Sequence, residues 1–240
     1  MHFSHHPAIR AGYPELAAGA LSVRGLCRDV QAEAVIARHE AVARARLEAA
    51  GSESELPEIQ AWRRAFARMG LKPTQYRCAS ESLLRRFRKD GALPRIHPLI
   101  DLCNAVSMAF AIPVAVLDVS CIEGSLEVRH AQGDERYLAF GGGIEQPEPG
   151  EVSFVDAAGN AHARRWTNRQ SGLSAVRDGT SDVLVVAEAM HGGGADDVAR
   201  LVEAIAAGLR EAWGAEARWQ LLSADRPRFD CDGDQHFSSR

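Results

Sequence analysis

The sequence predicts an α+β domain in which a mixed β-sheet core is flanked by helices. Helix-like segments fill the chain up to about residue 110, short strand-like segments fill residues 113–223, and no regular strand–helix repeat is present. Segregated helices and strands are typical of α+β folds, whereas regular alternation indicates a parallel α/β sheet. A chain of 240 residues can bury one full core, so we expect a single domain over residues 1–223 and a flexible tail over 224–240.

The first half of the chain begins with a polar stretch that includes His2, His5 and His6, which we expect to be disordered, and continues with a strand over residues 17–26. Helices follow, and prolines mark their starts because a first helical turn loses no hydrogen bond to proline. Glycines mark their ends because glycine tolerates the left-handed conformation found after many helices. These signals predict helices over residues 29–50, 57–69 and 80–89, and another that begins at Pro98.

The second half consists of short apolar segments separated by Gly/Pro loops. Strands are expected over residues 113–118, 125–131, 135–139, 152–155, 161–166 and 181–188. A last helix is expected over residues 195–211, because its apolar side chains recur on one face. A further strand over residues 216–222 would return to the sheet.

The cysteines and the hydropathy pattern exclude several classes of protein. Five cysteines lie at irregular spacing without a CxxC pair, which argues against a zinc site and against a disulfide framework. No run approaches the roughly 18 apolar residues of a membrane helix, and no signal peptide opens the chain. We therefore expect a cytoplasmic protein with no membrane association, no metal and no cofactor.

Positive charge is concentrated in one segment. Residues 62–95 hold ten Arg and Lys side chains against two acidic ones, in a chain whose net charge is −4. A polyanion would be attracted to this segment, unless acidic residues from elsewhere in the fold neutralise it. The expected RNA contacts lie on the basic helix, and DNA is not expected; the candidate residues are Arg85, Arg86, Arg88 and Lys89.

The helix that begins at Pro98 carries a polar face. His97, Asp101 and Asn104 are spaced i, i+4 and i+7, so they fall on one side of the helix. This face lies near the positive N-terminal end of the helix, and a polar pocket could form there. The alternative is structural: Asp101 would pair with a neighbouring arginine and Asn104 would fix a loop. The motif HGGG at residues 191–194 is interpreted as a strand-to-helix turn, because no GxSxG nucleophile accompanies it.

Two long runs carry a family resemblance. The run LLRRFRKDGALPRIHPLIDLCNAVSMAFAIPVAVLD covers residues 83–118, and RRWTNRQSGLSAVRDGTSDVLVVAEAM covers residues 164–190. Together they resemble the B3/B4 domain of the bacterial phenylalanyl-tRNA synthetase β subunit. The motifs LLRR, LPRI, PGEV and RRW-x-x-RQ are closer still to those of free-standing B3/B4 proteins. The resemblance extends over about residues 10–212.

The resemblance implies tRNA binding and an editing-type activity. In the synthetase, this domain hydrolyses tyrosine wrongly esterified to tRNA-Phe. The position of the synthetase's active-site histidine is Ala115 here, and the position of an asparagine is His97. We therefore expect His97 to orient or deprotonate the hydrolytic water, with Asn104 and Gln170 positioning the substrate. The expected substrate-binding residues are Arg95, Asp101 and Glu188.

An aminoacyl ester is already activated, so orienting a water and excluding bulk solvent supply much of the rate. A general base adds roughly 10²–10⁴-fold. The expected function is that of a stand-alone protein that binds tRNA or aminoacyl-tRNA and deacylates mischarged aminoacyl-tRNA in trans, without synthetase activity of its own. Two alternatives remain open: a non-catalytic RNA-binding module, and an enzyme that acts on a small amino-acid derivative.

Overall fold

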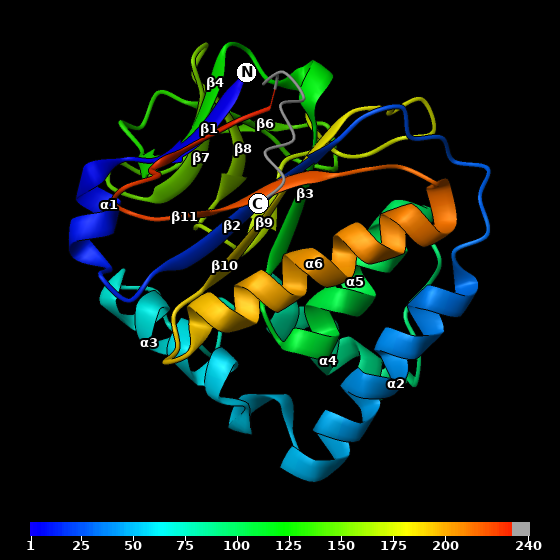
Figure 1. Ribbon diagram of the computed structural model, residues 1–240. Coiled ribbons are helices and arrows are strands. Elements are labelled where there is room, and N and C mark those ends of the chain that lie inside the picture. The colour runs from blue at the N-terminus through cyan, green and yellow to red at the C-terminus, as the bar shows by residue number, and fades with distance from the viewer. Residues whose placement is uncertain (232–240) are drawn as a thin grey trace.

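The structure is a computed structural model that describes residues 1–231, and this part of the chain forms six α-helices and two β-sheets (Figure 1). The helices are α1 (Pro7–Gly12), α2 (Glu33–Ala50), α3 (Pro57–Arg68), α4 (Ala79–Asp90), α5 (Pro98–Phe110) and α6 (Gly194–Trp213), with short 3-10 turns at η1 (Glu53–Glu55) and η2 (Val119–Cys121). The strands are β1 (His2–His5), β2 (Ala17–Val23), β3 (Val114–Asp118), β4 (Ser125–His130), β5 (Arg136–Leu138), β6 (Ile144–Glu145), β7 (Val152–Asp156), β8 (Asn160–Arg164), β9 (Arg169–Gln170), β10 (Val183–Ala189), β11 (Arg218–Leu222) and β12 (Arg228–Asp230).

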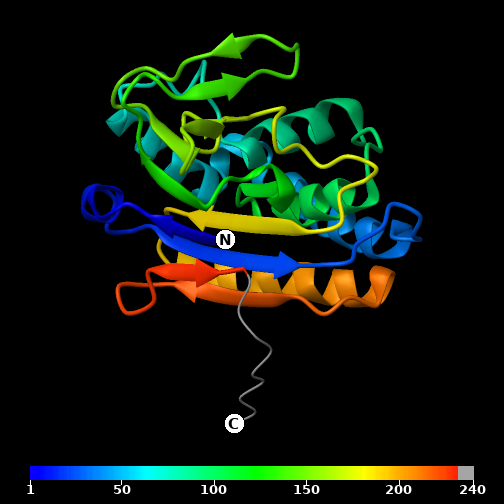
Figure 2. The same cartoon turned by 90° about the horizontal axis from the view of Figure 1, so that it is seen from above.

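The four-stranded sheet is antiparallel throughout, in the order β11-β2-β10-β3. β10 pairs with β2 along its full length, from Val183 opposite Val23 to Ala189 opposite Ala17. Figure 2 shows β10, β2 and β11 running side by side. Because β10 lies inside this sheet with its whole length buried, its sequence VLVVAEA is almost continuously apolar.

The alternation of side chains along β10 separates two hydrophobic cores. Val183 and Val185 point into the core beneath α5 and α6, whereas Leu184 and Val186 point into the core shared with the eight-stranded sheet. Glu188 has the same parity as Leu184 and Val186. The one carboxylate of this strand therefore faces the second core, between the two sheets.

Helix α6 lies across the four-stranded sheet and packs on β2, β10 and β11, with α5 behind it (Figure 1). Glycine permits this close approach at two places. A Cβ at Gly19 in β2 would lie 2.8 Å from Cγ1 of Val198, and one at Gly208 in α6 would lie 3.0 Å from the methyl groups of Leu102. Both distances are too short for ordinary contact, so the helix depends on these glycines to reach the sheet and α5.

The eight-stranded sheet has the order β12-β1-β4-β7-β8-β5-β6, and β9 pairs with β8 off this path. The β1–β4 and β5–β8 pairs are parallel and the others antiparallel, so the sheet is mixed. β1 lies between β12 and β4 and contributes the fully buried Phe3, which stacks on Phe154. The first residues of the chain are therefore part of the core.

The predicted α+β class with a mixed sheet and flanking helices is confirmed, although a second, antiparallel sheet accompanies the mixed one. Two expectations differ from the structure. The N-terminal residues expected to be disordered form β1 and α1, and the predicted tail from residue 224 contains β12, which pairs with β1. Residues 232–240 of that predicted tail lie outside the described residues. Within residues 1–231, no helix combines the length and apolar character needed to cross a bilayer.

Candidate functional site

A small cavity of about 60 Å³ lies where the two sheets and the start of α4 meet. Such a volume admits a few water molecules or a small polar group, whereas sites for whole drug-sized ligands occupy about 300–1,000 Å³. Its lining comes from β3, β7, β8, β9, β10 and the loops beside them: Ala79, Pro113, Val114, Ala115, Phe154, Ala163, Trp166, Thr167, Asn168, Arg169, Gln170, Val186 and Glu188.

The carboxylate of Glu188 is buried at this cavity and held in place by two donors. Its Oε1 lies 2.7 Å from Nε2 of His5 and accepts a hydrogen bond of 3.0 Å from Nε1 of Trp166. The guanidinium of Arg10 lies 3.2 Å from the other ring nitrogen of His5, Nδ1. Because arginine can only donate, Nδ1 is the acceptor, and the proton of a neutral His5 ring sits on Nε2, where it points at Glu188. This network supplies the partners that a buried carboxylate needs.

Three polar atoms at the cavity make no hydrogen bond within the described part of the chain. One is Oε2 of Glu188, because both of its donors use Oε1. Another is Oε1 of Gln170, whose Nε2 donates to the Val116 carbonyl at 2.7 Å. The third, Oγ1 of Thr167, is fully buried without a partner. Because the Thr167 oxygen has almost no accessible surface, the carboxylate oxygen and the amide oxygen are the acceptors open to the cavity. Two such acceptors suit a ligand group with several donors, such as an ammonium.

Trp166 closes one side of the cavity and is itself fully buried. Its ring packs edge-to-face on Trp62, with centroids 5.3 Å apart, and on Tyr13, at 4.8 Å. The backbone turns sharply here, since Arg165 and Trp166 have φ values of +48° and +57°. Non-glycine residues in the left-handed region cost of order 1–3 kcal/mol each and cluster at functional sites. The turn places the indole of Trp166 against Glu188.

The structure brings only part of the predicted site together. Gln170 and Glu188 line the cavity, and so does Ala115, where the resembling synthetase domain has its histidine. His97 and Asn104 do not line it. The expectation that His97, Asn104 and Gln170 converge is therefore wrong, because α5 contributes no side chain to this cavity.

His97 and Asp101 instead organise the start of α5. His97 is the N-cap residue, and its Nδ1 accepts the backbone N–H of Leu99 at 3.3 Å. Burial lowers the pKa of His97, so its ring is neutral at pH 7. Both carboxylate oxygens of Asp101 accept the N–H of Ile96, at 3.0 and 3.2 Å. Asn104 is half-buried further along the helix. His97 thus satisfies a backbone donor of the first helical turn, and Asp101 fixes the residue that precedes the N-cap.

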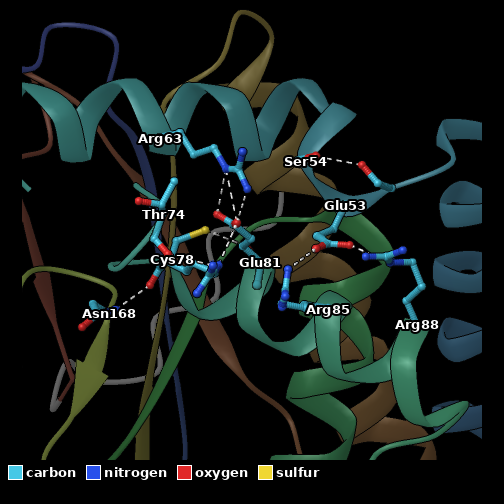
Figure 3. A network of polar contacts seen from close by, with 12 residues as sticks. Glu53, Ser54, Arg63, Thr74, Cys78, Glu81, Arg85, Arg88 and Asn168 are labelled. Atoms are coloured by element: carbon cyan, nitrogen blue, oxygen red, sulfur yellow. Dashed lines mark hydrogen bonds and ion pairs between the residues drawn. The ribbon is translucent and has the colours of Figure 1, made fainter. Parts of the chain in front are cut away.

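Two arginines of the basic helix share one carboxylate from another element, Glu53 (Figure 3). Buried Glu53 lies 2.8 Å from Nε of Arg88 and 3.6 Å from Nη1 of Arg85. Arg86 pairs with Asp90 at 3.5 Å along the same helix. Lys89 forms no ion pair within residues 1–231. The arginine side chains are still about half exposed, at 57% for Arg85 and Arg86 and 46% for Arg88.

Arg95 and the other arginines beside the basic helix are neutralised in the same way. Arg95 pairs with Glu40 at 2.6 Å and with Glu33 at 3.3 Å, both on α2, and so lies outside the cavity. Arg63 contacts buried Glu81 at 2.6 Å. Glu81 belongs to the segment itself, so the part of its positive charge that is neutralised from outside is the part that faces Glu33, Glu40 and Glu53.

A Ser–His–Asp arrangement also occurs, but it lies in the core. Oγ of Ser174 lies 2.8 Å from Nδ1 of His162, whose Nε2 lies 3.1 Å from Oδ2 of Asp156. The His162 and Asp156 side chains and the whole of Ser174 have no exposed surface. A catalytic serine must reach its substrate, so this triad is a structural hydrogen-bond network.

Three residues at the site were not predicted from the sequence. Trp166 and Thr167 lie inside the motif RRWTNRQ, a few residues before Gln170, and this position was the sequence signal that could have indicated them. His5 gave no such signal, because the contact between residues 5 and 188 depends on β1 joining the distant strand β4.

Comparisons with known proteins identify the family of the chain. A family model described as "B3/4 domain" matches residues 61–200, more than half of the chain. The phenylalanine–tRNA ligase beta subunit of Cereibacter sphaeroides is 29% identical over 149 residues, which cover 58% of this chain and 18% of that protein. The chain thus matches less than a fifth of that relative. An N-terminal fragment of the phenylalanyl-tRNA synthetase beta subunit from Pyrococcus horikoshii matches with a TM-score of 0.42 at 14% identity, over 50% of this chain and 41% of that one. The chain belongs to the B3/4 domain family.

Proposed function

We propose that this protein binds aminoacylated tRNA and hydrolyses its ester bond in trans, with the amino acid received at the cavity beside Glu188. The observation that carries the proposal is the pair of uncommitted oxygens on Glu188 and Gln170, which line the cavity within the segment that matches the B3/4 family. An aminoacyl ester presents an α-ammonium group with three N–H donors, which is the group that such a site would hold.

The proposed reaction adds water to the ester carbonyl carbon, breaks the bond between that carbon and the ribose oxygen, and passes a proton to the ribose. No histidine lines the cavity, and its one carboxylate, Glu188, is committed in this proposal to the substrate ammonium, so no side chain of the lining is left to act as general base. Positioning of the ester and of the water then supplies most of the acceleration. Without a histidine, we expect the reaction to lack the roughly 10²–10⁴-fold that a general base contributes.

The cavity also limits the substrate. A volume of about 60 Å³ accommodates the ammonium end of an amino acid and little more. An amino acid with a large side chain would require Trp166 or the neighbouring loop to move. We therefore expect a preference for aminoacyl groups with small side chains.

The exposed cations of α4 would contact the tRNA backbone. Arg86 is paired only with a residue on its own helix, and Lys89 with no carboxylate in the described residues, so these two are the least committed of the four candidates. Each phosphate contact that releases a counterion steepens the salt dependence of binding. Binding should accordingly weaken as salt rises, and the double variant Arg86→Ala/Lys89→Ala should show a smaller slope.

The decisive experiment measures free amino acid released from a panel of mischarged tRNAs by the wild-type protein and by Glu188→Gln. The substitution keeps an oxygen that accepts hydrogen bonds from His5 and Trp166, but it replaces the second carboxylate oxygen by an NH₂ group and removes the negative charge. We expect release from at least one substrate and a loss of at least tenfold in the variant. His97→Asn, which retains a good N-cap residue, is the matched control and should behave as the wild type. If no amino acid is released from any substrate while salt-sensitive tRNA binding is retained, the proposed hydrolysis is wrong and the protein is a non-catalytic RNA-binding module.

A second candidate is favoured by the ion pairs of the basic helix. Because Glu53 and Glu81 already hold Arg88, Arg85 and Arg63, RNA would have to compete with buried carboxylates. This observation favours an enzyme that acts on a small amino-acid derivative at the same cavity. Hydrolysis of a simple aminoacyl ester, without measurable tRNA binding at low salt, would select this candidate over the first.

A further inference from the structure

We infer that Glu58, His191 and Asp197 form a binding site for a divalent transition-metal ion, separate from the Glu188 cavity. Each residue offers one ligand atom, and the three atoms lie within 4.8 Å of one another. Within residues 1–231 this is the only group of three or more His, Cys, Asp or Glu residues with that property. The site departs from the expectation, drawn from the sequence, of a protein without a metal.

Three separate elements place these ligands. Glu58 lies in the first turn of α3, directly after Pro57, and Asp197 lies in the first turn of α6. His191 lies in the turn between β10 and α6, where the sequence HGGG leads into the helix. Nε2 of His191 is already 2.7 Å from Oδ2 of Asp197. The glycines after His191 let the chain turn back so that its imidazole meets a carboxylate six residues later.

Two buried atoms at this cluster have no hydrogen-bond partner. Glu58 is 6% exposed, and while its Oε1 is held by Nη2 of Arg46 at 2.7 Å, its Oε2 is unpartnered. The side chain of His191 is 8% exposed, and its Nδ1 is also unpartnered. A buried carboxylate oxygen without a partner is costly, and a cation bound by Oε2 of Glu58, Nε2 of His191 and Oδ2 of Asp197 would remove that cost and replace the proton between His191 and Asp197. Nδ1 of His191 lies on the other side of the ring and would stay outside the coordination sphere.

The donor set identifies the class of ion. One imidazole and two carboxylates suit zinc and its neighbours, whereas magnesium and calcium prefer oxygen ligands alone. Three protein ligands leave a coordination position for water. His191 also lines an open cleft of about 730 Å³, together with Arg10, Glu15 and Leu222, and this cleft provides an entry path. Arg46 and Arg200 contact the two carboxylates and would lower the affinity, although Arg200 is 68% exposed and free to swing away.

Bound metal would join the start of α3 to the start of α6. Since the ligands come from elements far apart in the sequence, binding requires the folded chain and should raise its melting temperature. The site can be tested without any knowledge of the substrate, so failure of the deacylase proposal would leave it unaffected.

The test is a titration of the chelator-treated full-length protein with Zn²⁺ by calorimetry, with a parallel Co²⁺ titration followed by visible absorption. We expect one ion per chain, a higher melting temperature, and a loss of affinity of at least tenfold in both His191→Asn and Glu58→Gln. His6→Asn is the control, because this exposed residue lies outside the cluster, and it should bind as the wild type does. Far-UV circular dichroism establishes that each variant is folded, and Asp197→Asn replaces any that is not.

Two outcomes would overturn the inference. One is an absence of Zn²⁺ binding by the wild type at 100-fold molar excess, which would mean that the unpartnered atoms are satisfied by an ordered water. The other is Zn²⁺ binding that is equally tight in the folded variants, which would place the ion elsewhere on the chain.

Discussion

Replacing Trp166 by phenylalanine should destabilise the protein by removing one specific hydrogen bond at the candidate site. The indole Nε1 donates to Oε1 of Glu188 at 3.0 Å, and both groups are buried. A hydrogen bond to a charged group contributes about 1.5–3 kcal/mol, and loss of it leaves the carboxylate with His5 as its remaining donor.

The packing of the smaller ring adds to this cost. Phenylalanine preserves edge-to-face contact with Trp62 and Tyr13, so most of the aromatic cluster survives. The missing ring atoms leave a void in a fully buried position, which adds roughly 1 kcal/mol by the cost of small core cavities. The total is about 2.5–4 kcal/mol, which corresponds to a fall in melting temperature of roughly 5–15 °C for a chain of this size.

The assay is thermal unfolding followed by circular dichroism, with urea titration for the free energy of unfolding. Trp219→Phe is the matched control, because Trp219 is 37% exposed on β11 and should change stability by less than about 0.5 kcal/mol. If Trp166→Phe is no more destabilised than the control, the hydrogen bond between Trp166 and Glu188 does not stabilise the walls of the cavity.

Three further predictions concern the rest of the fold. Burial lowers the pKa of His162, so the unfolded chain binds a proton more readily than the folded chain. The free energy of unfolding should therefore fall as the pH drops below about 6.5, by up to about 1.4 kcal/mol per pH unit from this residue. In urea denaturation measured at several pH values, His162→Gln should make this pH dependence weaker. Gly19→Ala should cost about 1–3 kcal/mol in thermal unfolding, because its Cβ would meet Val198 at 2.8 Å; an unchanged melting temperature would show that α6 can retreat freely. Burial raises the pKa of the Cys103 thiol to about 12, so a thiol reagent at pH 8 should modify exposed Cys27 and leave Cys103 unmodified until the protein is unfolded; rapid modification of Cys103 in the native state would contradict its burial.

Local sequence signals predicted most of the elements, because their boundaries depend on residues close in the chain. Pro57 and Pro98 each stand at the first position of their helix, and Gly91 follows α4 in the left-handed conformation. The strand predicted over residues 181–188 is β10, at Val183–Ala189. What local signals did not show is that β1 and β12 pair with each other, since strands 2–5 and 228–230 meet only in the folded molecule.

The candidate site was predicted in part for the same reason. Gln170 and Glu188 lie in runs with a family resemblance and do line the cavity. His97 was chosen because it shares a helix face with Asp101, but spacing on a helix does not show whether that face borders a cavity or caps the helix itself. The charge of the basic helix was predicted from the residues of that helix alone. Glu53, which pairs with two of its arginines, lies in a turn more than thirty positions away, so the local sequence did not show this pairing.

The most direct test of the account is the affinity of the protein for an amide-linked, non-hydrolysable aminoacyl-adenosine. The account places the α-ammonium of this ligand on the free oxygen of Glu188, so the wild type should bind it and Glu188→Gln should bind at least tenfold more weakly, the loss expected for one charge-assisted hydrogen bond of about 1.5 kcal/mol or more. His97→Asn should bind like the wild type. Equal affinity in the wild type and Glu188→Gln, with binding lost in His97→Asn, would contradict the account and move the site to the start of α5.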